Sequence, residues 1–135
     1  MERKKVIISG KRKTSVARIE LSDGKGNISY NGNSYQSIRE FHKLTLIEPI
    51  RIYEQVLGKF NFDVKISVVG GGKESQVQAA RLGIAKALMK FTENKELKDA
   101  FINYDRHLLV ADVRRKETCK PGDSKARAMR QSSKR

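Results

Sequence analysis

Apolar and polar residues alternate along two stretches of the chain, which is the pattern of β-strands with one buried face. The shorter stretch, residues 17–21, places Ala, Ile and Leu on one side and charged residues on the other. The longer stretch, residues 60–68, alternates Phe, Val and Ile with polar residues. Apolar runs at residues 6–9 and 28–30 predict two shorter strands. Because Asn31-Gly32 is typical of a two-residue hairpin, we expect the first 36 residues to form an antiparallel meander.

Apolar residues at spacings of three and four predict helices in the second half. Pro49 suits the first turn of a helix that would end at Gly58. A long helix is expected over residues 75–91, and Asn94 is a suitable N-cap for a last helix. Residues 108–110 predict a final short strand. The buried stripe of the long helix would consist of Val77, Ala80, Ile84, Leu88 and Phe91. Strands followed by a strand–helix unit indicate an α+β fold with helices on one sheet face.

The distribution of charge divides the chain into three parts. The net charge is +14, but residues 19–113 carry 13 basic and 12 acidic residues and are almost neutral. Residues 1–18 carry seven Lys or Arg against one acid, and residues 114–135 carry nine against two. The last segment also has only four apolar residues, too few for a core. We therefore expect one globular domain over residues 1–112 and an extended basic tail over residues 113–135.

Several classes of function find no support in the sequence. No apolar run approaches the ~20 residues of a membrane span, and nothing resembles a secretory signal, so a cytoplasmic protein is expected. The single Cys119 and the distant His42 and His107 offer no metal spacing. The acids form no suggested pair, and no nucleophile lies in a catalytic context. We therefore predict no catalytic residues, no metal and no cofactor.

Two glycine-containing features could approach a phosphate backbone. The loop Gly70-Gly71-Gly72 joins a strand to a helix, where backbone amides can hold an anion, but it is not a Walker A loop. A tight turn, a phosphate contact and a nucleotide site all remain compatible with it. Ala79, Gly83 and Ala87 share one narrow helix face, which indicates close approach either of a strand or of an RNA backbone.

The two basic extremities favour a polyanionic partner. Three adjacent cations, residues 11–13, repel one another between two predicted strands, and the Thr14 and Ser15 hydroxyls could add phosphate hydrogen bonds. The tail combines spaced arginines with small alanines, which suits a chain threading between phosphates. A simple disordered arm and a membrane-surface segment are the alternatives. Because the tail lacks Trp, Phe and Leu for insertion into a membrane interface, nucleic acid is preferred.

Several separated motifs carry a resemblance to a known family. The glycine loop followed by Gln76, Arg81 and the run 83–88 resembles the signature of the universal ninth small-subunit ribosomal protein family. The segments Gly10–Arg18, Asn31-Gly32 and Glu48-Pro49 resemble further motifs of that family in the same order. The stretch Tyr104–Asp112 resembles its archaeal and eukaryotic branch.

The resemblance implies a two-layer sandwich of the ribosomal S5-domain-2-like type, with a mixed sheet, helices on one face and an extended basic C-terminal tail. It implies a structural constituent of the small-subunit head that binds rRNA and neighbouring ribosomal proteins, not a homo-oligomer and not a membrane protein. In the family the tail reaches the peptidyl-site tRNA. The aromatic residue usual near the end of relatives is absent here, where Ser132 and Lys134 stand. A phosphate- or nucleotide-handling enzyme using the glycine loop and a non-ribosomal RNA chaperone are the competing hypotheses.

Position in the motifs and charge together assign residues to the two RNA partners. The residues predicted to bind rRNA are Lys11, Arg12, Lys13, Thr14, Arg18, Gly70, Gly71, Gly72, Lys73, Gln76, Arg81, Arg106, Arg114, Arg115, Lys116, Lys120, Lys125 and Arg127. The resemblance implies, by position in the tail, that the residues binding tRNA are Arg130, Gln131, Lys134 and Arg135.

Overall fold

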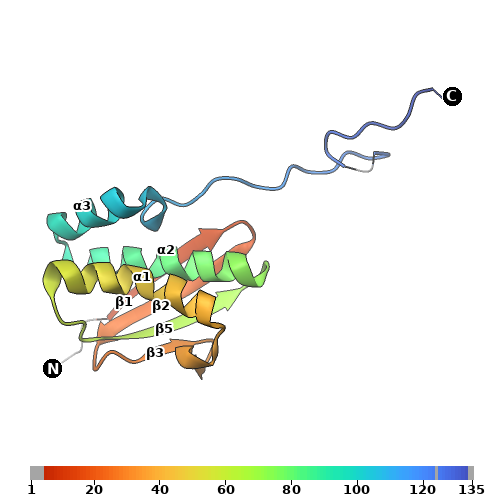
Figure 1. The fold of residues 1–135 in the computed structure, drawn as a ribbon. Helices are drawn as coiled ribbons and strands as arrows, with labels where there is room; N and C mark the ends of the chain where they lie inside the picture. Colours follow the sequence, from red (N-terminus) through yellow and green to blue (C-terminus); the bar gives the residue numbers. More distant parts are fainter. Residues whose placement is uncertain (1–4, 124, 134–135) are drawn as a thin grey trace.

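Helices cover one face of a five-stranded sheet in the computed structural model, which describes residues 5–123 and 125–133 (Figure 1). The strand order is β1-β2-β5-β3-β4. This arrangement confirms the predicted α+β fold with a mixed sheet. The elements are β1 Lys5–Arg12, β2 Ser15–Asp23, β3 Ile28–Tyr30, β4 Asn33–Ser34, a 3-10 turn η1 Tyr35–Ser37, α1 Glu40–Leu57, β5 Phe62–Val69, α2 Lys73–Thr92, α3 Lys95–Tyr104 and a second 3-10 turn η2 Arg106–Leu108.

The sheet does not follow the expected meander beyond its first hairpin. Strand β2 pairs antiparallel with β5, not with β3, and β3 pairs parallel with β5 through the α1 crossover. The long alternating pattern of β5 explains its central place, because its apolar residues extend the buried face of β2, as where Ile66 lies opposite Ile19. The three-residue β3 has little apolar surface and lies nearer the edge. Its hairpin with β4 forms at Asn31-Gly32, as predicted, with positive φ at both residues.

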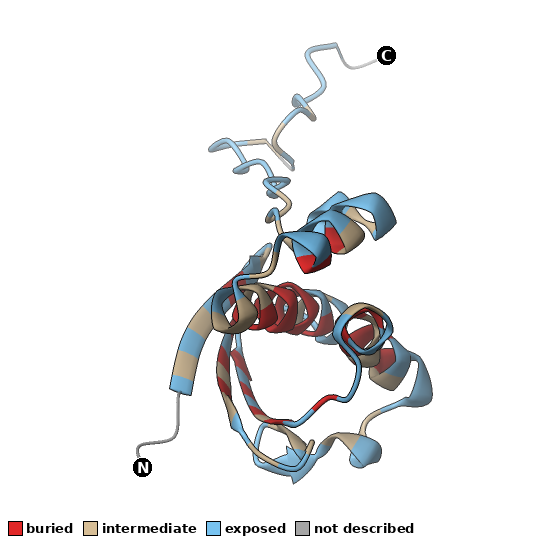
Figure 2. Cartoon of the chain, turned by 90° about the vertical axis from the view of Figure 1, so that its left-hand side faces the viewer, coloured by how far each residue is buried: buried red, intermediate tan, exposed pale blue. Residues whose placement is uncertain are grey.

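Helix α2 forms the centre of the molecule. It packs on β1 and β2 with one side and against α1 with another, and Figure 2 shows the buried residues concentrated around it. Gly10 of β1 and Gly83 of α2 meet at this contact. A Cβ atom on Gly10 would overlap the carbonyl oxygen of Ala79 and would lie 2.8 Å from the Gly83 nitrogen. Close strand packing therefore accounts for the small-residue face of α2, which is buried and not open to RNA.

Two local predictions are wrong. Helix α1 begins at Glu40, so Pro49 lies inside the helix, not in its first turn. His42, Thr45 and Leu46 face the core from the added turns, and their burial outweighs the hydrogen bond that proline cannot donate. The strand expected at residues 108–110 is absent: the chain forms η2 and then coil, because the fully buried Leu108 packs with η2 against the helices α2 and α3.

The tail leaves the body as an extended chain. From Val113 onward the described residues contain neither helix nor strand, and the segment projects well beyond the fold (Figure 1). Two of its apolar side chains, Val113 and Met129, are 86% and 88% exposed. No helix within residues 5–123 and 125–133 is long and apolar enough to span a membrane.

Candidate nucleic-acid interface

The tip of the β1–β2 hairpin lies against the glycine loop. Arg12 and Ser15 are the last paired residues, so Lys13 and Thr14 form the turn, with Lys13 at φ 53°. The fully buried Ser15 hydroxyl donates to the Gly70 carbonyl at 2.9 Å and lies 2.8 Å from the Ser75 hydroxyl. Ser15 therefore fixes the hairpin tip relative to the start of α2.

The glycine loop is a tight turn in which the Gly70 and Gly72 carbonyls and the Gly72 amide find partners within the protein. Gly70 and Gly71 have φ of 77° and 64°, which favours glycine at both positions. The Gln76 side chain donates to the Gly70 carbonyl at 3.0 Å, and the Ser75 hydroxyl accepts from the Gly72 amide at 3.1 Å. Gln76 therefore holds the loop in shape, while Lys73 remains exposed beside it.

A basic groove forms between the hairpin tip and the root of the tail. It has a volume of about 680 Å³ and is lined by Arg12, Lys13, Thr14, Arg114, Arg115 and Lys116. All six residues were predicted from the sequence, although they come from segments about 100 positions apart. Five cations in one acid-free lining repel one another, and a phosphate backbone would relieve that repulsion.

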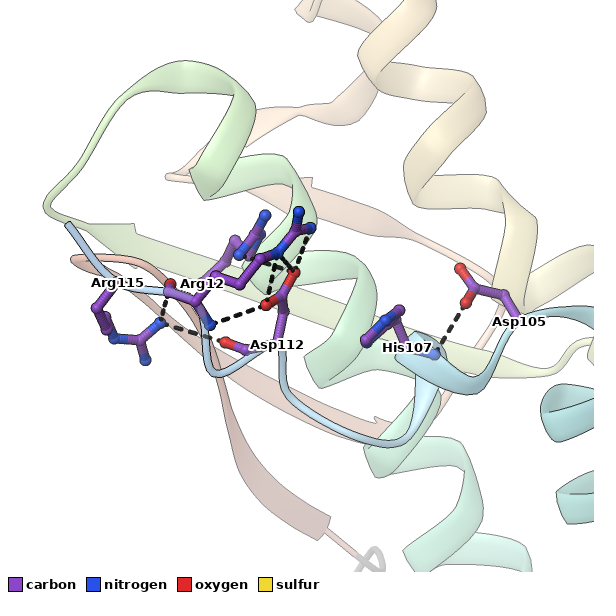
Figure 3. A network of polar contacts seen from close by, with 6 residues as sticks. Arg12, Asp105, His107, Asp112 and Arg115 are labelled. Carbon is purple, nitrogen blue, oxygen red and sulfur yellow. Dashed lines mark hydrogen bonds and ion pairs between the residues drawn. The ribbon is translucent and has the colours of Figure 1, made fainter. Parts of the chain in front are cut away.

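One carboxylate stands beside the groove. The Asp112 carboxylate accepts three short hydrogen bonds from the Arg114 guanidinium, the shortest 2.7 Å, and one of 2.9 Å from the Arg114 backbone amide (Figure 3). Arg12 Nη1 lies 3.0 Å from the same carboxylate. The Arg114 side chain first, and then its amide, hold the pKa of Asp112 well below its usual range. Asp112 is therefore ionised throughout the physiological range.

Arg81 is occupied inside the chain. Its Nε donates to Glu48 at 2.6 Å and its Nη1 donates to Asp105 at 2.8 Å, and its side chain is only 11% exposed. Two carboxylates compensate its charge, so this arginine serves the packing of α1, α2 and η2. Arg81 is therefore not available to the nucleic-acid interface.

Other predicted rRNA residues lie away from the groove. Arg18 projects from the open face of the sheet, between Ser9 and Ser67 of the neighbouring strands. Lys11 is exposed on β1 and lines a hollow beside the groove together with Arg12 and Arg114, and Arg106 is exposed on η2. These three cations have no ion-pair partner within the described part of the chain. They extend the positive surface but do not converge on one point.

Beyond its root at residues 113–116, the described tail forms only exposed contacts with itself. Arg127 pairs with Glu117 at 2.8 Å, with the arginine side chain 87% exposed. The Arg130 guanidinium donates to the Gly122 carbonyl at 3.0 Å. Lys120, Lys125 and Gln131 are exposed. Lys134 and Arg135, the sharpest of the tRNA predictions, lie outside the described residues.

Two residues shape this end of the molecule in ways that sequence reasoning missed. Ser15 was predicted to bind phosphate, but its buried hydroxyl binds the Gly70 carbonyl, and Asp112 was given no role. Ser15 and Asp112 hold the hairpin tip and the tail root, and neither carries a positive charge. A serine that begins a buried strand and a lone acid before a run of cations are weak signals in sequence. Their importance depends on partners 55 and 100 positions away.

Comparison with known proteins decides the family. The sequence model of the family described as ribosomal protein S9/S16 matches residues 10–135. The chain belongs to this family. The small ribosomal subunit protein uS9 of Methanococcus vannielii is 42% identical over 127 residues, covering 92% of this chain and 93% of the relative. The uS9 protein of Methanococcus maripaludis matches with the same identity and coverage. These archaeal S9 relatives confirm the predicted branch of the family.

Proposed function

We propose that this chain is a structural component of the small ribosomal subunit that binds rRNA through the basic groove and the tail. Within this proposal, residues 1–112 form the globular RNA-binding domain and residues 113–135 form the arm. The observation that carries it is the groove lined by five cations, of which only Arg12 and Arg114 pair with the single carboxylate at its edge, located where a strongly basic tail leaves the fold of an S9/S16 family member. The partners are small-subunit rRNA and neighbouring ribosomal proteins, in the cytoplasm.

Binding would proceed by charge neutralisation and positioning. Lys13, Arg115 and Lys116 form no ion pair with an acid within the described residues, so they are ready to contact phosphates. Thr14 adds a hydroxyl at the hairpin tip, and contacts of this kind fix register without reading sequence. Where the backbone of small-subunit rRNA bends sharply, several phosphates lie close together. Such a bend suits a groove that gathers cations from two segments of the chain.

The end of the tail is proposed to contact peptidyl-site tRNA. Its support is the family motif together with the exposed Arg130 and Gln131, which precede Lys134 and Arg135 in the sequence. The chain carries no aromatic residue in this segment, so the proposed contact is between cations and phosphates and does not involve base stacking.

An enzymatic function has no comparable support. The glycine loop binds the protein's own Ser15 and Gln76 through the Gly70 carbonyl. Membership of a ribosomal protein family supports a structural component that is not an enzyme. An RNA chaperone outside the ribosome is the alternative that experiment should separate.

Fractionation tests the proposal directly. The full-length chain, tagged and expressed in Methanococcus maripaludis, is expected to sediment with small ribosomal subunits through a high-salt gradient. Salt weakens its phosphate contacts, but a chain packed among rRNA and neighbouring proteins stays bound. A free chaperone would remain near the top of the gradient after the salt wash. Recovery of the chain only in that top fraction would overturn the proposal.

A further inference from the structure

Asp112 is an acid placed where simple electrostatics opposes it. It lies at the edge of the cationic groove, and its side chain is only 11% exposed. A negative charge next to a phosphate-binding surface repels the ligand and lowers affinity. If the groove binds RNA, Asp112 must therefore add to the affinity in another way, and its contacts show how.

The contacts of Asp112 are of two kinds. The Arg114 amide donates to the carboxylate, which closes a local turn and fixes the direction of the chain at the point where the tail begins. The Arg12 guanidinium reaches the same carboxylate from strand β1, which ties that turn to the hairpin (Figure 3). One side chain therefore sets both the direction and the location of the tail root.

A second arginine reinforces the turn. Arg115 Nη1 donates to the backbone carbonyls of Asp112 and Arg114, both at 3.2 Å (Figure 3). Arg12, Arg114 and Arg115 all line the groove, so the turn around Asp112 also arranges three of its five cations.

We propose that Asp112 is a positioning residue that clamps the root of the basic tail to the β1–β2 hairpin and so holds the groove cations in one arrangement for an RNA strand. The proposal rests on the proposed RNA-binding function. Without the clamp, the root and its arginines would have to be ordered during each binding event, and that ordering costs affinity. The net effect of the acid is then favourable in spite of its charge.

The binding test asks whether removing the negative charge of Asp112 weakens or strengthens rRNA binding. Asp112→Asn removes a negative charge, yet the full-length variant should bind in vitro transcribed small-subunit rRNA roughly three- to tenfold more weakly, the range expected for ordering a few side chains. The control is Glu117→Gln, which removes the same charge from an exposed pair in the tail and should leave affinity equal or slightly tighter. Equal or tighter binding by Asp112→Asn would overturn the proposal.

A second variant separates position from charge. Asp112→Glu keeps the carboxylate but moves it one methylene outward, so it cannot accept from the Arg114 amide in the same turn. We expect its affinity to fall between those of Asp112→Asn and the wild type. Wild-type affinity in Asp112→Glu would show that charge alone matters and would contradict the clamp.

A measurement without RNA tests the clamp itself. In a Cys119→Ser background, spin labels at Thr14→Cys and Val113→Cys report the distance between the hairpin tip and the tail root; both native side chains are exposed. The distance distribution should be narrow, and should broaden in Asp112→Asn and equally in Arg12→Met. Combining the two changes should add nothing further, since they break the same contact. An unchanged distribution would overturn the clamp, whereas a wild type that fails to bind rRNA would overturn the proposed function instead.

Discussion

Gly10 occupies the middle of a β-strand, where glycine is ordinarily unfavourable. Its missing side chain is what allows α2 to rest directly on β1, because the Ala79 carbonyl fills the space that a Cβ atom would need. On the α2 side, Gly83 faces the Ile19 side chain. A Cβ atom added to Gly83 would lie 2.5 Å from Ile19 Cγ1. The cost of glycine in a strand and in a helix is thus offset by close packing at the centre of the core.

Adding a methyl group at Gly10 should therefore be strongly destabilising. Gly10→Ala forces strand and helix apart, and we expect the free energy of unfolding to fall by about 2–3 kcal/mol, the upper range for overpacking. Urea denaturation followed by circular dichroism measures this change. Ser9→Ala is the matched control, since Ser9 lies next in the strand and faces solvent. A loss below about 0.5 kcal/mol for Gly10→Ala would contradict the packing argument.

At the scale of elements, one ion-pair node joins three separate segments. Glu48 of α1 and Asp105 before η2 both bind Arg81 of α2. The same node fixes the end of α3 over the body, immediately before the chain turns into the tail. Because this segment is anchored at Asp105, residues 104–112 fix where the tail begins relative to the body.

The contribution of this node should depend on pH. Burial acts to raise the pKa of Asp105, but hydrogen bonds from Arg81 and from the His107 amide outweigh it, and the net pKa lies below the usual 3.8. A group with a lowered folded-state pKa stabilises the fold above its unfolded-state pKa, and that contribution is lost as the pH falls through the folded-state value.

Asp105→Asn should accordingly lower the free energy of unfolding by roughly 1–2 kcal/mol between pH 5 and 7. The difference from the wild type should begin to shrink below about pH 4, where the carboxyl of the unfolded chain binds a proton, and should continue to shrink as the pH falls through the lower folded-state pKa. Unfolding curves across this range provide the measurement, with Asp99→Asn on the exposed face of α3 as the control. A difference that is constant down to pH 3 would exclude the ion pair as its source.

At the scale of the whole molecule, the body and the tail contribute different kinds of energy. The body is stabilised by a buried core, whereas the tail buries little of its own surface and carries nine of the 29 basic residues. Ordering such a segment costs about 1–2 kcal/mol of backbone entropy per residue, so an RNA partner has to supply the compensating contacts.

Graded truncation should separate the two parts of the tail. If the arm engages about six phosphates, ending the chain after Asp112 should reduce the steepness of log affinity against log salt by about 4 in rRNA binding. Removing only Lys134 and Arg135 should leave subunit assembly intact and weaken tRNA retention in the peptidyl site. Filter binding over a salt series and tRNA retention on purified subunits measure these effects. An unchanged salt slope after the first truncation, or unchanged retention after the second, would count against the corresponding contact.

Features set by near neighbours in the chain were predictable from the sequence. The alternation of residues 60–68 correctly predicted β5, and Asn31-Gly32 correctly predicted the turn between β3 and β4. Asn94 caps α3, because its side chain accepts a 2.8 Å hydrogen bond from the Glu96 amide. Each of these signals depends on a few adjacent residues and on the period of one element. The same holds for the uneven charge, which located the basic extremities before any fold was known.

Only the tertiary structure decided which distant segments meet. Pairing of β2 with β5 instead of β3, and the start of α1 nine residues before Pro49, follow from burial against partners that no local pattern specifies. The same applies to Arg81, which looks like any other cation in sequence but is enclosed by two carboxylates. Sequence determined the residues available for binding RNA, and the fold decided which of them gather at the groove, because long-range packing alone brings the hairpin and the tail root together.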